Sequence, residues 1–150
     1  MNDDLLMLLH DVARMQRTRF DQWARTYGMT RAQGVILLRL ARQPGISQIE
    51  MAALCEVEPI TVGRLVDRLE ARGLIERRLD PGDRRVRRLH LLPAAQPILA
   101  KIEVYKGELM AFLTGGLDPK AIETTNDVLL HMKNKLAQEA AAGKAAAGGA

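Results

Sequence analysis

The chain has 150 residues, of which 47% are apolar, 3% are aromatic and one, Cys55, is a cysteine. This length predicts one domain that can bury a core without disulfides or metals. A lone cysteine excludes an intrachain disulfide and a cysteine-based zinc cluster, and we expect no metal and no cofactor. The chain begins MNDDLLMLLHD, with acids where a signal peptide needs basic residues, and no apolar run reaches membrane-spanning length. We therefore expect a cytoplasmic protein without a membrane partner.

The first predicted helix starts at Asp3 or Asp4, runs to about Tyr27 and stops at Gly28. Its broad apolar face comprises Leu5, Leu8, Leu9, Val12, Met15, Phe20, Trp23 and Ala24. A helix of about 24 residues is about 36 Å long, which is more than one small domain covers. Packing of this helix against another subunit is therefore expected.

Two capping boxes and a proline predict the next three helices. The boxes are Thr30 with Gln33, and Ser47 with Glu50; they open a helix to about Arg42 and a short helix to about Leu54. Val35, Ile36, Leu38 and Leu40 are the expected core residues of the first of these helices, and Met51, Ala52 and Leu54 those of the second. In the third helix, Glu58 is the expected cap, Pro59 lies in the first turn and Gly73 ends the helix. A short helix, a tight turn and a longer helix form the helix-turn-helix pattern.

After Gly73 the sequence predicts a β-hairpin. Leu74 and Ile75 open the first strand, Pro81-Gly82-Asp83 is a turn signal, and Val86, Leu89 and Leu91 belong to the returning strand. Val62, Leu65, Val66 and Leu69 give the preceding helix its buried stripe. A helix followed by such a hairpin is typical of a winged helix-turn-helix. Ile46 is too short a strand signal to stand alone, although winged helices often have a first strand there.

The positive charge of the chain is concentrated in this helix and hairpin. From Pro59 to Leu92 there are nine arginines and five acids, a difference of 9 − 5 = +4 that equals the net charge of the whole chain. Local excess charge favours a polyanionic partner, and arginine suits bidentate contact with phosphate or guanine. A solvated, salt-bridged surface is the alternative for the helix alone. The helix together with the hairpin tip favours DNA.

The hairpin tip is the sharpest functional signal. Asp83, Arg84 and Arg85 follow the turn, and an arginine on a protruding hairpin suits the minor groove of DNA. Asp83 would be repelled by phosphate, so we expect it to pair with Arg77 or Arg85 and to hold the wing in shape.

Two further helices complete the predicted fold. One begins at Pro93 and ends near Leu113, with Ile98, Ile102, Tyr105, Leu109 and Phe112 on its buried face together with Leu99 and Leu113. The other begins with Asp118-Pro119 and ends near Glu139, and residues 140–150 are expected to form a flexible tail. The predicted class is mainly α with a small antiparallel β wing.

No pattern in the sequence indicates an enzyme. His10, His90 and His131 are scattered, and there is no nucleophile motif, phosphate loop or dinucleotide motif. Cys55 could be a redox sensor, but a small thiol facing the core is favoured. Trp23 could be a core residue or could line a ligand cavity, and the core is favoured.

Two phrases resemble the MarR family of winged helix-turn-helix transcription regulators. They are MTRAQGVILLRLARQPGISQIEMAALCEV and TVGRLVDRLEARGLIERRLDPGDRRVRRLHLL, and with the flanking helices the resemblance covers residues 1–139. It implies a DNA-binding lobe at 29–92 and dimerisation helices at 3–27 and 94–139. One departure is Leu92-Pro93, where the family often has a threonine cap.

The resemblance also implies roles for single residues. Thr61 and Arg64 match positions that reach major-groove bases, Arg85 matches the wing-tip arginine, and Ser47 and Gln48 match the start of the helix that meets the DNA backbone. With Arg68 and Arg84, these are the expected DNA contacts.

A homodimer on a pseudo-palindromic operator is implied, usually acting as a repressor that a small, often aromatic, effector releases. His10, Arg14 and Trp23 are the candidate effector residues. The alternative is a winged helix that binds another protein and no specific DNA.

Overall fold

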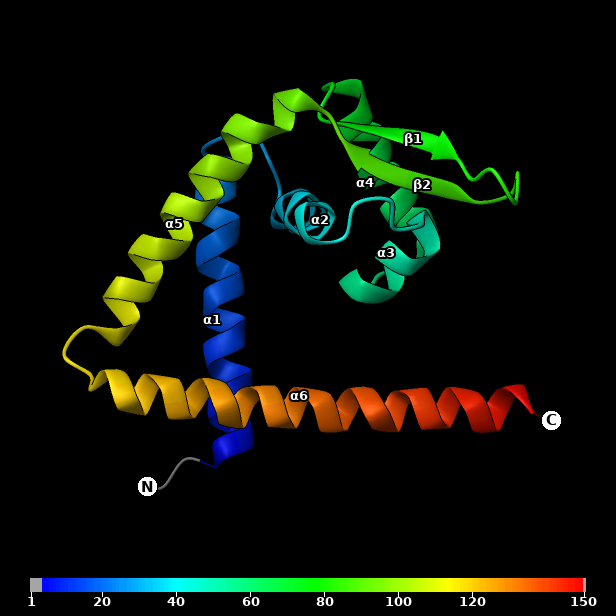
Figure 1. Cartoon of the computed structure of the whole chain (residues 1–150). Coiled ribbons are helices and arrows are strands. Elements are labelled where there is room, and N and C mark those ends of the chain that lie inside the picture. Colours follow the sequence, from blue (N-terminus) through cyan, green and yellow to red (C-terminus); the bar gives the residue numbers. More distant parts are fainter. Residues whose placement is uncertain (1–3, 150) are drawn as a thin grey trace. The chain divides into compact units, whose positions relative to one another are not determined.

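The computed structural model describes residues 4–149, which divide into two compact units that meet between Val104 and Tyr105 (Figure 1). The first unit contains α1 (Leu5–Arg25), α2 (Arg31–Arg42), α3 (Gln48–Cys55), α4 (Pro59–Ala71), β1 (Ile75–Leu79) and β2 (Arg87–Leu91). A 3-10 turn at Pro93–Ala95 leads into α5 (Gln96–Thr114), which continues into the second unit. The second unit also contains α6 (Pro119–Gly148). The predicted class, mainly α with a small antiparallel wing, is confirmed.

The helix starts follow local hydrogen bonding, with one exception. Asp4 caps α1, and both predicted capping boxes form with reciprocal side-chain bonds. The Glu58 side chain makes no capping bond, so that part of the prediction is wrong. Instead, the Glu58 carbonyl accepts bonds from the amides of Thr61 at 2.9 Å and Val62 at 3.1 Å. With Pro59 at the first position, which has no amide hydrogen to satisfy, α4 starts without a side-chain cap.

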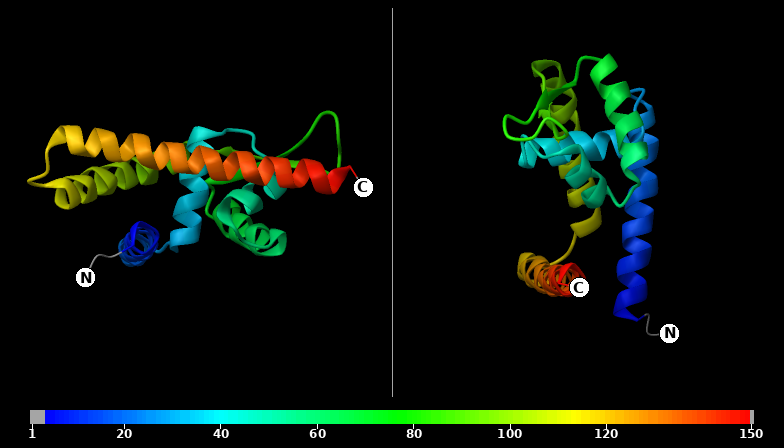
Figure 2. Two further views of the ribbon diagram at one scale, coloured as in Figure 1. Left: turned by 90° about the horizontal axis from the view of Figure 1, so that it is seen from below. Right: turned by 90° about the vertical axis from the view of Figure 1, so that its right-hand side faces the viewer.

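The wing is a two-stranded antiparallel hairpin. Ile75 lies opposite Leu91, Arg77 opposite Leu89 and Leu79 opposite Arg87. In place of a first strand at Ile46, the structure has a single bridge between Ser47 and Arg88. Figures 1 and 2 show the turn between β1 and β2 projecting beyond α3 and α4. The tip of the hairpin is therefore accessible within this unit.

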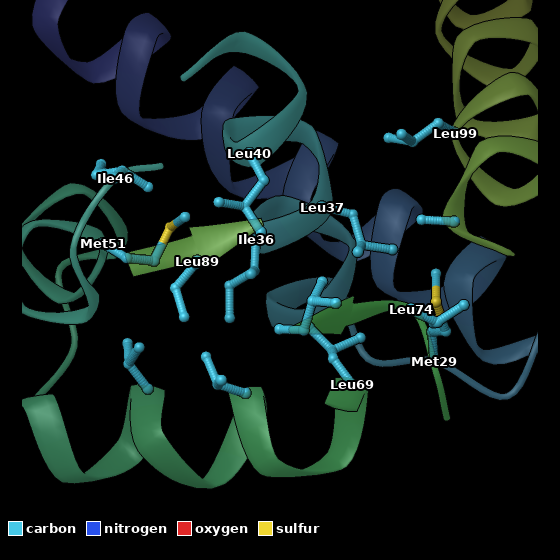
Figure 3. Packing of buried hydrophobic residues seen from close by; sticks show 14 of the residues in the cluster. Met29, Ile36, Leu37, Leu40, Ile46, Met51, Leu69, Leu74, Leu89 and Leu99 are labelled. Atoms are coloured by element: carbon cyan, nitrogen blue, oxygen red, sulfur yellow. The ribbon is translucent and has the colours of Figure 1, made fainter. Parts of the chain in front are cut away.

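The core of the first unit lies between α2, α3, α4 and the wing (Figure 3). Fully buried side chains come from each of these elements: Ile36, Leu37, Leu40, Met51, Val62, Val66, Leu69, Ile75 and Leu89. Leu37 was not among the predicted core residues, and Leu54, which was, is 38% exposed. The predicted stripe of α4 is buried at three of its four positions, with Leu65 partly exposed. This packing fixes which face of α4 points outward.

Several helix boundaries differ from the prediction. Helix α1 ends at Arg25 and not near Tyr27, and Gly28 then takes a φ of 69°. Helix α6 continues to Gly148, so the predicted end at Glu139 is wrong. The small residues there are mostly alanine, which has the highest helix propensity. On α5, Leu99, Ile102 and Tyr105 are buried as predicted, whereas Phe112 is 68% and Leu113 is 47% exposed. Across the described helices, none is long and apolar enough to cross a membrane.

Candidate nucleic-acid interface

Helix α4 presents a polar outer face opposite its buried stripe. Thr61, Arg64 and Arg68 are all exposed, as their helical spacing relative to Val62, Val66 and Leu69 requires. Between residues 4 and 149, no carboxylate forms an ion pair with Arg64 or Arg68. Their guanidinium groups are thus available to an external acceptor.

Arg77 on β1 joins the wing to α4. Its Nη2 donates to Asp67 Oδ1 at 2.6 Å and its Nη1 donates to Glu70 Oε1 at 3.2 Å. Nη2 also donates to the carbonyl of Gly63 at 3.0 Å. The Arg77 side chain is only 19% exposed. The wing is therefore held against α4 by a largely buried cation with two carboxylate partners.

The same arginine reaches α3 through Gln48. Arg77 Nε donates to Gln48 Oε1 at 3.0 Å. A Cβ at Gly63 would come within 3.3 Å of Gln48 Nε2, so glycine leaves room for this side chain at the crossing of α3 and α4. The sequence predicted Gln48 as a DNA contact, whereas here its side-chain oxygen is bound to Arg77. Ser47 caps α3 by accepting from the Glu50 amide at 3.1 Å.

A second arginine anchors the base of the wing turn. Arg88 Nε donates to Asp80 Oδ2 at 2.6 Å, and Arg88 Nη1 donates to the carbonyl of Gly45 at 3.0 Å. Asp80 Oδ1 also accepts from the Gly82 amide at 2.7 Å. Both hydrogen bonds hold the pKa of Asp80 below its usual value, and the one from the Gly82 amide has the larger effect.

At the tip, Asp83 pairs with Arg85 and not with Arg77. Asp83 Oδ1 accepts from Arg85 Nε at 3.2 Å and from the Arg85 amide at 3.0 Å. Both hydrogen bonds lower the pKa of Asp83, and the one from the Arg85 side chain has the larger effect. The Arg85 side chain remains 91% exposed. Arg77, the other partner that the sequence offered for Asp83, binds Asp67 and Glu70 instead.

The arrangement separates two groups of charges. Every acid of the wing and of the adjoining face of α4 has an arginine partner: Asp67 and Glu70 with Arg77, Glu76 with Arg78, Asp80 with Arg88, and Asp83 with Arg85. Arg64, Arg68 and Arg84 are exposed, and none of them pairs with a carboxylate in the part of the chain that the structure describes. The exposed face of α4 and the wing tip therefore carry net positive charge, which is suited to a polyanion.

Sequence reasoning missed Asp80 and Arg88 as wing-stabilising residues. A signal was present, because an aspartate before Pro81-Gly82 commonly accepts from a turn amide. Nothing in the sequence indicated that Arg88 would reach the carbonyl of Gly45, since the two are 43 residues apart.

The candidate effector residues lie along α1. His10 and Arg14 are exposed, and Arg14 pairs with Asp11 at 3.6 Å. Trp23 packs against the core and stacks on Phe20, with ring centroids 5.7 Å apart. Because α1 is one continuous helix, His10 and Trp23 are about 20 Å apart along its axis. One small molecule cannot touch both on the same helix, and the structure does not bring these three residues together.

Cys55 is half-buried at the end of α3. Its Sγ lies 3.7 Å from Met51 Sδ, and it lines a cavity of about 30 Å³ with Arg31, Ala32, Val35, Val57 and Leu65. Burial raises the pKa of the thiol, and Arg39 and Arg31 offset this only in part. A raised pKa leaves less thiolate at neutral pH, which favours a packing role for Cys55.

Comparison with known proteins agrees with this geometry. A sequence profile of the MarR family matches residues 27–86. A Thauera aromatica protein, assigned as a transcriptional regulatory protein for the hcr operon, is 35% identical over 117 residues, or 68% of this chain and 69% of that protein. A crystal structure of a MarR protein superposes with a TM-score of 0.81 at 26% identity, covering 91% of this chain and 93% of that one. The DNA complex of S. aureus MepR has a TM-score of 0.73 at 22% identity, covering 89% and 99%, and this likeness concerns the fold.

Proposed function

The chain belongs to the MarR family of transcriptional regulators, a class of non-enzymes, and on this premise we propose that it binds a specific double-stranded DNA operator. The observation that supports the proposal best is the set of exposed arginines without carboxylate partners on α4 and at the wing tip. In this proposal Thr61 and Arg64 contact base edges in the major groove, where the first turns of a recognition helix usually lie. Arg68, Ser47 and Gln48 contact the DNA backbone, and Arg84 and Arg85 at the wing tip enter the minor groove.

The ion pair at the wing tip is compatible with DNA binding. An exposed pair such as Asp83–Arg85 stabilises the protein by about 0–1 kcal/mol, so Arg85 can exchange its partner at little cost. The hydrogen bond from the Arg85 backbone amide to Asp83 Oδ1 shapes the turn independently of the guanidinium. Asp83 thus positions the tip while Arg85 remains free to reach the groove.

We propose that the protein acts as a homodimer on a pseudo-palindromic operator. On α1, the side chains of Leu5, Leu6, Met7, Leu8, Val12 and Met15 are each 44% exposed or more. In the second unit, Met110, Phe112, Leu117, Val128, Leu130 and Leu136 are similarly exposed. So many exposed apolar side chains on helices indicate a partner surface, and a second copy of the chain satisfies the two-fold symmetry of an operator.

The dimer is tested by light scattering coupled to size-exclusion chromatography. We expect twice the chain mass for the wild type. The double variant Leu6→Glu and Met15→Glu should shift the mass towards that of one chain. The matched control is Leu79→Glu on the wing, also at an exposed leucine, which should leave the mass unchanged. A monomeric wild-type protein would contradict the proposal.

The experiment that tests DNA binding is fluorescence anisotropy with the DNA upstream of the coding sequence and a scrambled duplex, over a series of salt concentrations. We expect at least about 10³-fold tighter binding to the upstream DNA and a steep loss of affinity with salt. A winged helix that only binds other proteins would bind both duplexes weakly and equally, and would tolerate Arg64→Ala and Arg85→Ala without loss of function. Repression is then tested with a reporter fused to the same DNA.

We further propose that the protein acts in the cytoplasm and that a small effector, of the often aromatic kind that the family resemblance implies, releases it from DNA. Such a ligand must bind the non-DNA geometry of the dimer more tightly than the DNA-bound geometry. Trp23, His10 and Arg14 remain the proposed contacts. Because His10 and Trp23 are far apart on one helix, either they contact separate ligands, or one ligand contacts Trp23 of one copy and His10 of the other. A panel of phenols and aromatic carboxylates, added to the preformed protein–DNA complex, tests for release.

A further inference from the structure

Ile60, the second residue of α4, is 67% exposed. It lies next to Thr61 and one helical turn before Arg64, on the face of α4 that points away from the core. It is therefore a large apolar side chain within the proposed DNA-binding surface.

The fold does not require an isoleucine at this position. The core contacts of α4 come from Val62, Val66 and Leu69, with Leu65 packed partly against them, and Ile60 is outside this cluster. A β-branched residue also has a slightly lower helix propensity than alanine. Burial in this unit and helix formation thus give no reason for the side chain.

The surroundings of Ile60 do not form a hydrophobic docking patch. Apart from Pro59 at the start of the helix, the other exposed residues in this part of α4 are Thr61, Arg64, Arg68 and Asp67, and Asp67 is paired with Arg77. A protein-binding surface usually needs a contiguous apolar area of several hundred square ångströms, and a single isoleucine among arginines does not supply it. The cationic setting favours DNA as the molecule that covers this side chain.

In the major groove, the apolar group that a side chain can contact is the C5-methyl group of thymine. The first residues of a recognition helix are the ones that reach base edges. The stiff χ1 of isoleucine keeps its methyl groups in one place, which suits a fixed apolar contact. Resting on the proposed operator binding, we propose that Ile60 recognises a thymine methyl group in each half-site and thereby contributes to sequence specificity.

Replacement of thymine by deoxyuridine tests this contact, because uracil lacks only the C5-methyl group and keeps the same hydrogen-bonding edge. The full-length protein is first used to select a binding duplex from a random library, and each thymine is then replaced singly by deoxyuridine. Burial of one methyl group is worth about 0.8 kcal/mol, so one replacement should weaken wild-type binding about fourfold. Symmetric replacement in both half-sites should weaken it about 16-fold.

Ile60→Ala carries the decisive comparison. It should bind the thymine duplex about 16-fold more weakly than the wild type does, and the symmetric deoxyuridine replacement should then have no further effect. The matched control is Ile49→Ala on α3, which removes an isoleucine of similar exposure, 70%. This variant should keep the full response to deoxyuridine.

The inference is overturned if Ile60→Ala responds to deoxyuridine as the wild type does, or if no thymine in the selected duplex responds. It is also overturned if Ile49→Ala loses the response to the same extent. Failure of the operator proposal has a different result, because no duplex would then be enriched from the library. Circular dichroism of both variants confirms that each is folded.

Discussion

Arg77 Nη2 on β1 donates a hydrogen bond of 2.6 Å to Asp67 Oδ1 on α4. The two residues are ten positions apart in the sequence, and their ion pair spans the junction between α4 and the wing. Because Glu70 and Gly63 on α4 and Gln48 on α3 bind the same guanidinium, Arg77 connects β1 to two helices at once. The relative position of α4 and the wing therefore depends on this side chain in addition to their shared core.

Arg77→Ala should reduce the free energy of unfolding by about 1–3 kcal/mol, since hydrogen bonds to charged groups contribute about this much. Asp67 and Glu70 are 67% and 43% exposed, so water can solvate them after the loss, which favours the lower end of the range. Urea denaturation measures the change. The matched control is Arg78→Ala on the same strand, whose exposed pair with Glu76 should contribute less than about 1 kcal/mol. Equal losses in the two variants would show that the junction has no special role.

Arg85→Ala should weaken operator binding while leaving stability nearly unchanged, because its side chain is 91% exposed. Because Arg85 brings one positive charge into the minor groove of each half-site in the proposed complex, the slope of log affinity against log salt should become shallower by about one for each wing. Anisotropy at several salt concentrations measures this slope. An Arg85→Ala protein that is unfolded would contradict the placement of this side chain at the tip.

Arg64→Ala should weaken binding by about 1–3 kcal/mol and relax the preference at one base position in each half-site. The reason is that Arg64 has an exposed guanidinium on the outer face of α4 and no carboxylate partner among the described residues. Binding to a set of duplexes with single base changes measures the preference. Arg25→Ala is the control, because it removes the same charge from α1, where Arg25 pairs with Asp21. An equal loss of affinity on every duplex would mean that Arg64 contacts a phosphate group and not a base.

The two carboxylates of the wing turn should titrate at lower pH than an ordinary aspartate. Both pKa values are lowered from 3.8 in the folded state, so the stabilisation of the turn is fully present above about pH 3.8. It is lost as the pH falls through the lowered folded-state values, when the carboxylates are protonated. Carbon-13 NMR of the Asp80 and Asp83 carboxyl groups follows this titration.

The same NMR titration can distinguish the contribution of the Asp83–Arg85 pair from that of the Asp80–Arg88 pair. Arg85→Ala should raise the pKa of Asp83 towards 3.8, because the Arg85 side chain is its largest hydrogen-bonding partner. The pKa of Asp80 should not change, since its low value depends mainly on the Gly82 amide and on Arg88. A shift of both values together would show that the turn behaves as one coupled unit.

Much of the first unit could be predicted from the sequence, because its signals are local. The capping boxes at Thr30 and Ser47, the first-turn Pro59 and the turn at Pro81-Gly82 each fix a boundary within a few residues. The MarR resemblance and the absence of an enzyme motif agree with the family to which the chain belongs. The outer face of α4 followed from its buried stripe.

The interactions between elements could not be predicted in this way. The sequence offered Arg77 or Arg85 as the partner of Asp83, and only the hairpin register, with Arg77 opposite Leu89, places Arg77 away from the tip. The sequence also did not indicate that the crossing of α3 and α4 at Gly63 brings the Gln48 side chain to Arg77. The end of α6 was placed too early because low complexity was interpreted as a tail, whereas alanine favours helix.

The hydrogen bonds of Arg77 limit how an effector can act. Because the guanidinium of Arg77 on β1 binds both α3 and α4, distortion of a single lobe would break several charged hydrogen bonds. The spacing between two rigid lobes on a dimer can change without breaking any of them. For the proposed dimer we therefore expect the proposed effector to release DNA by a mismatch between lobe spacing and half-site spacing, and operators with one base pair inserted between their half-sites should mimic its action.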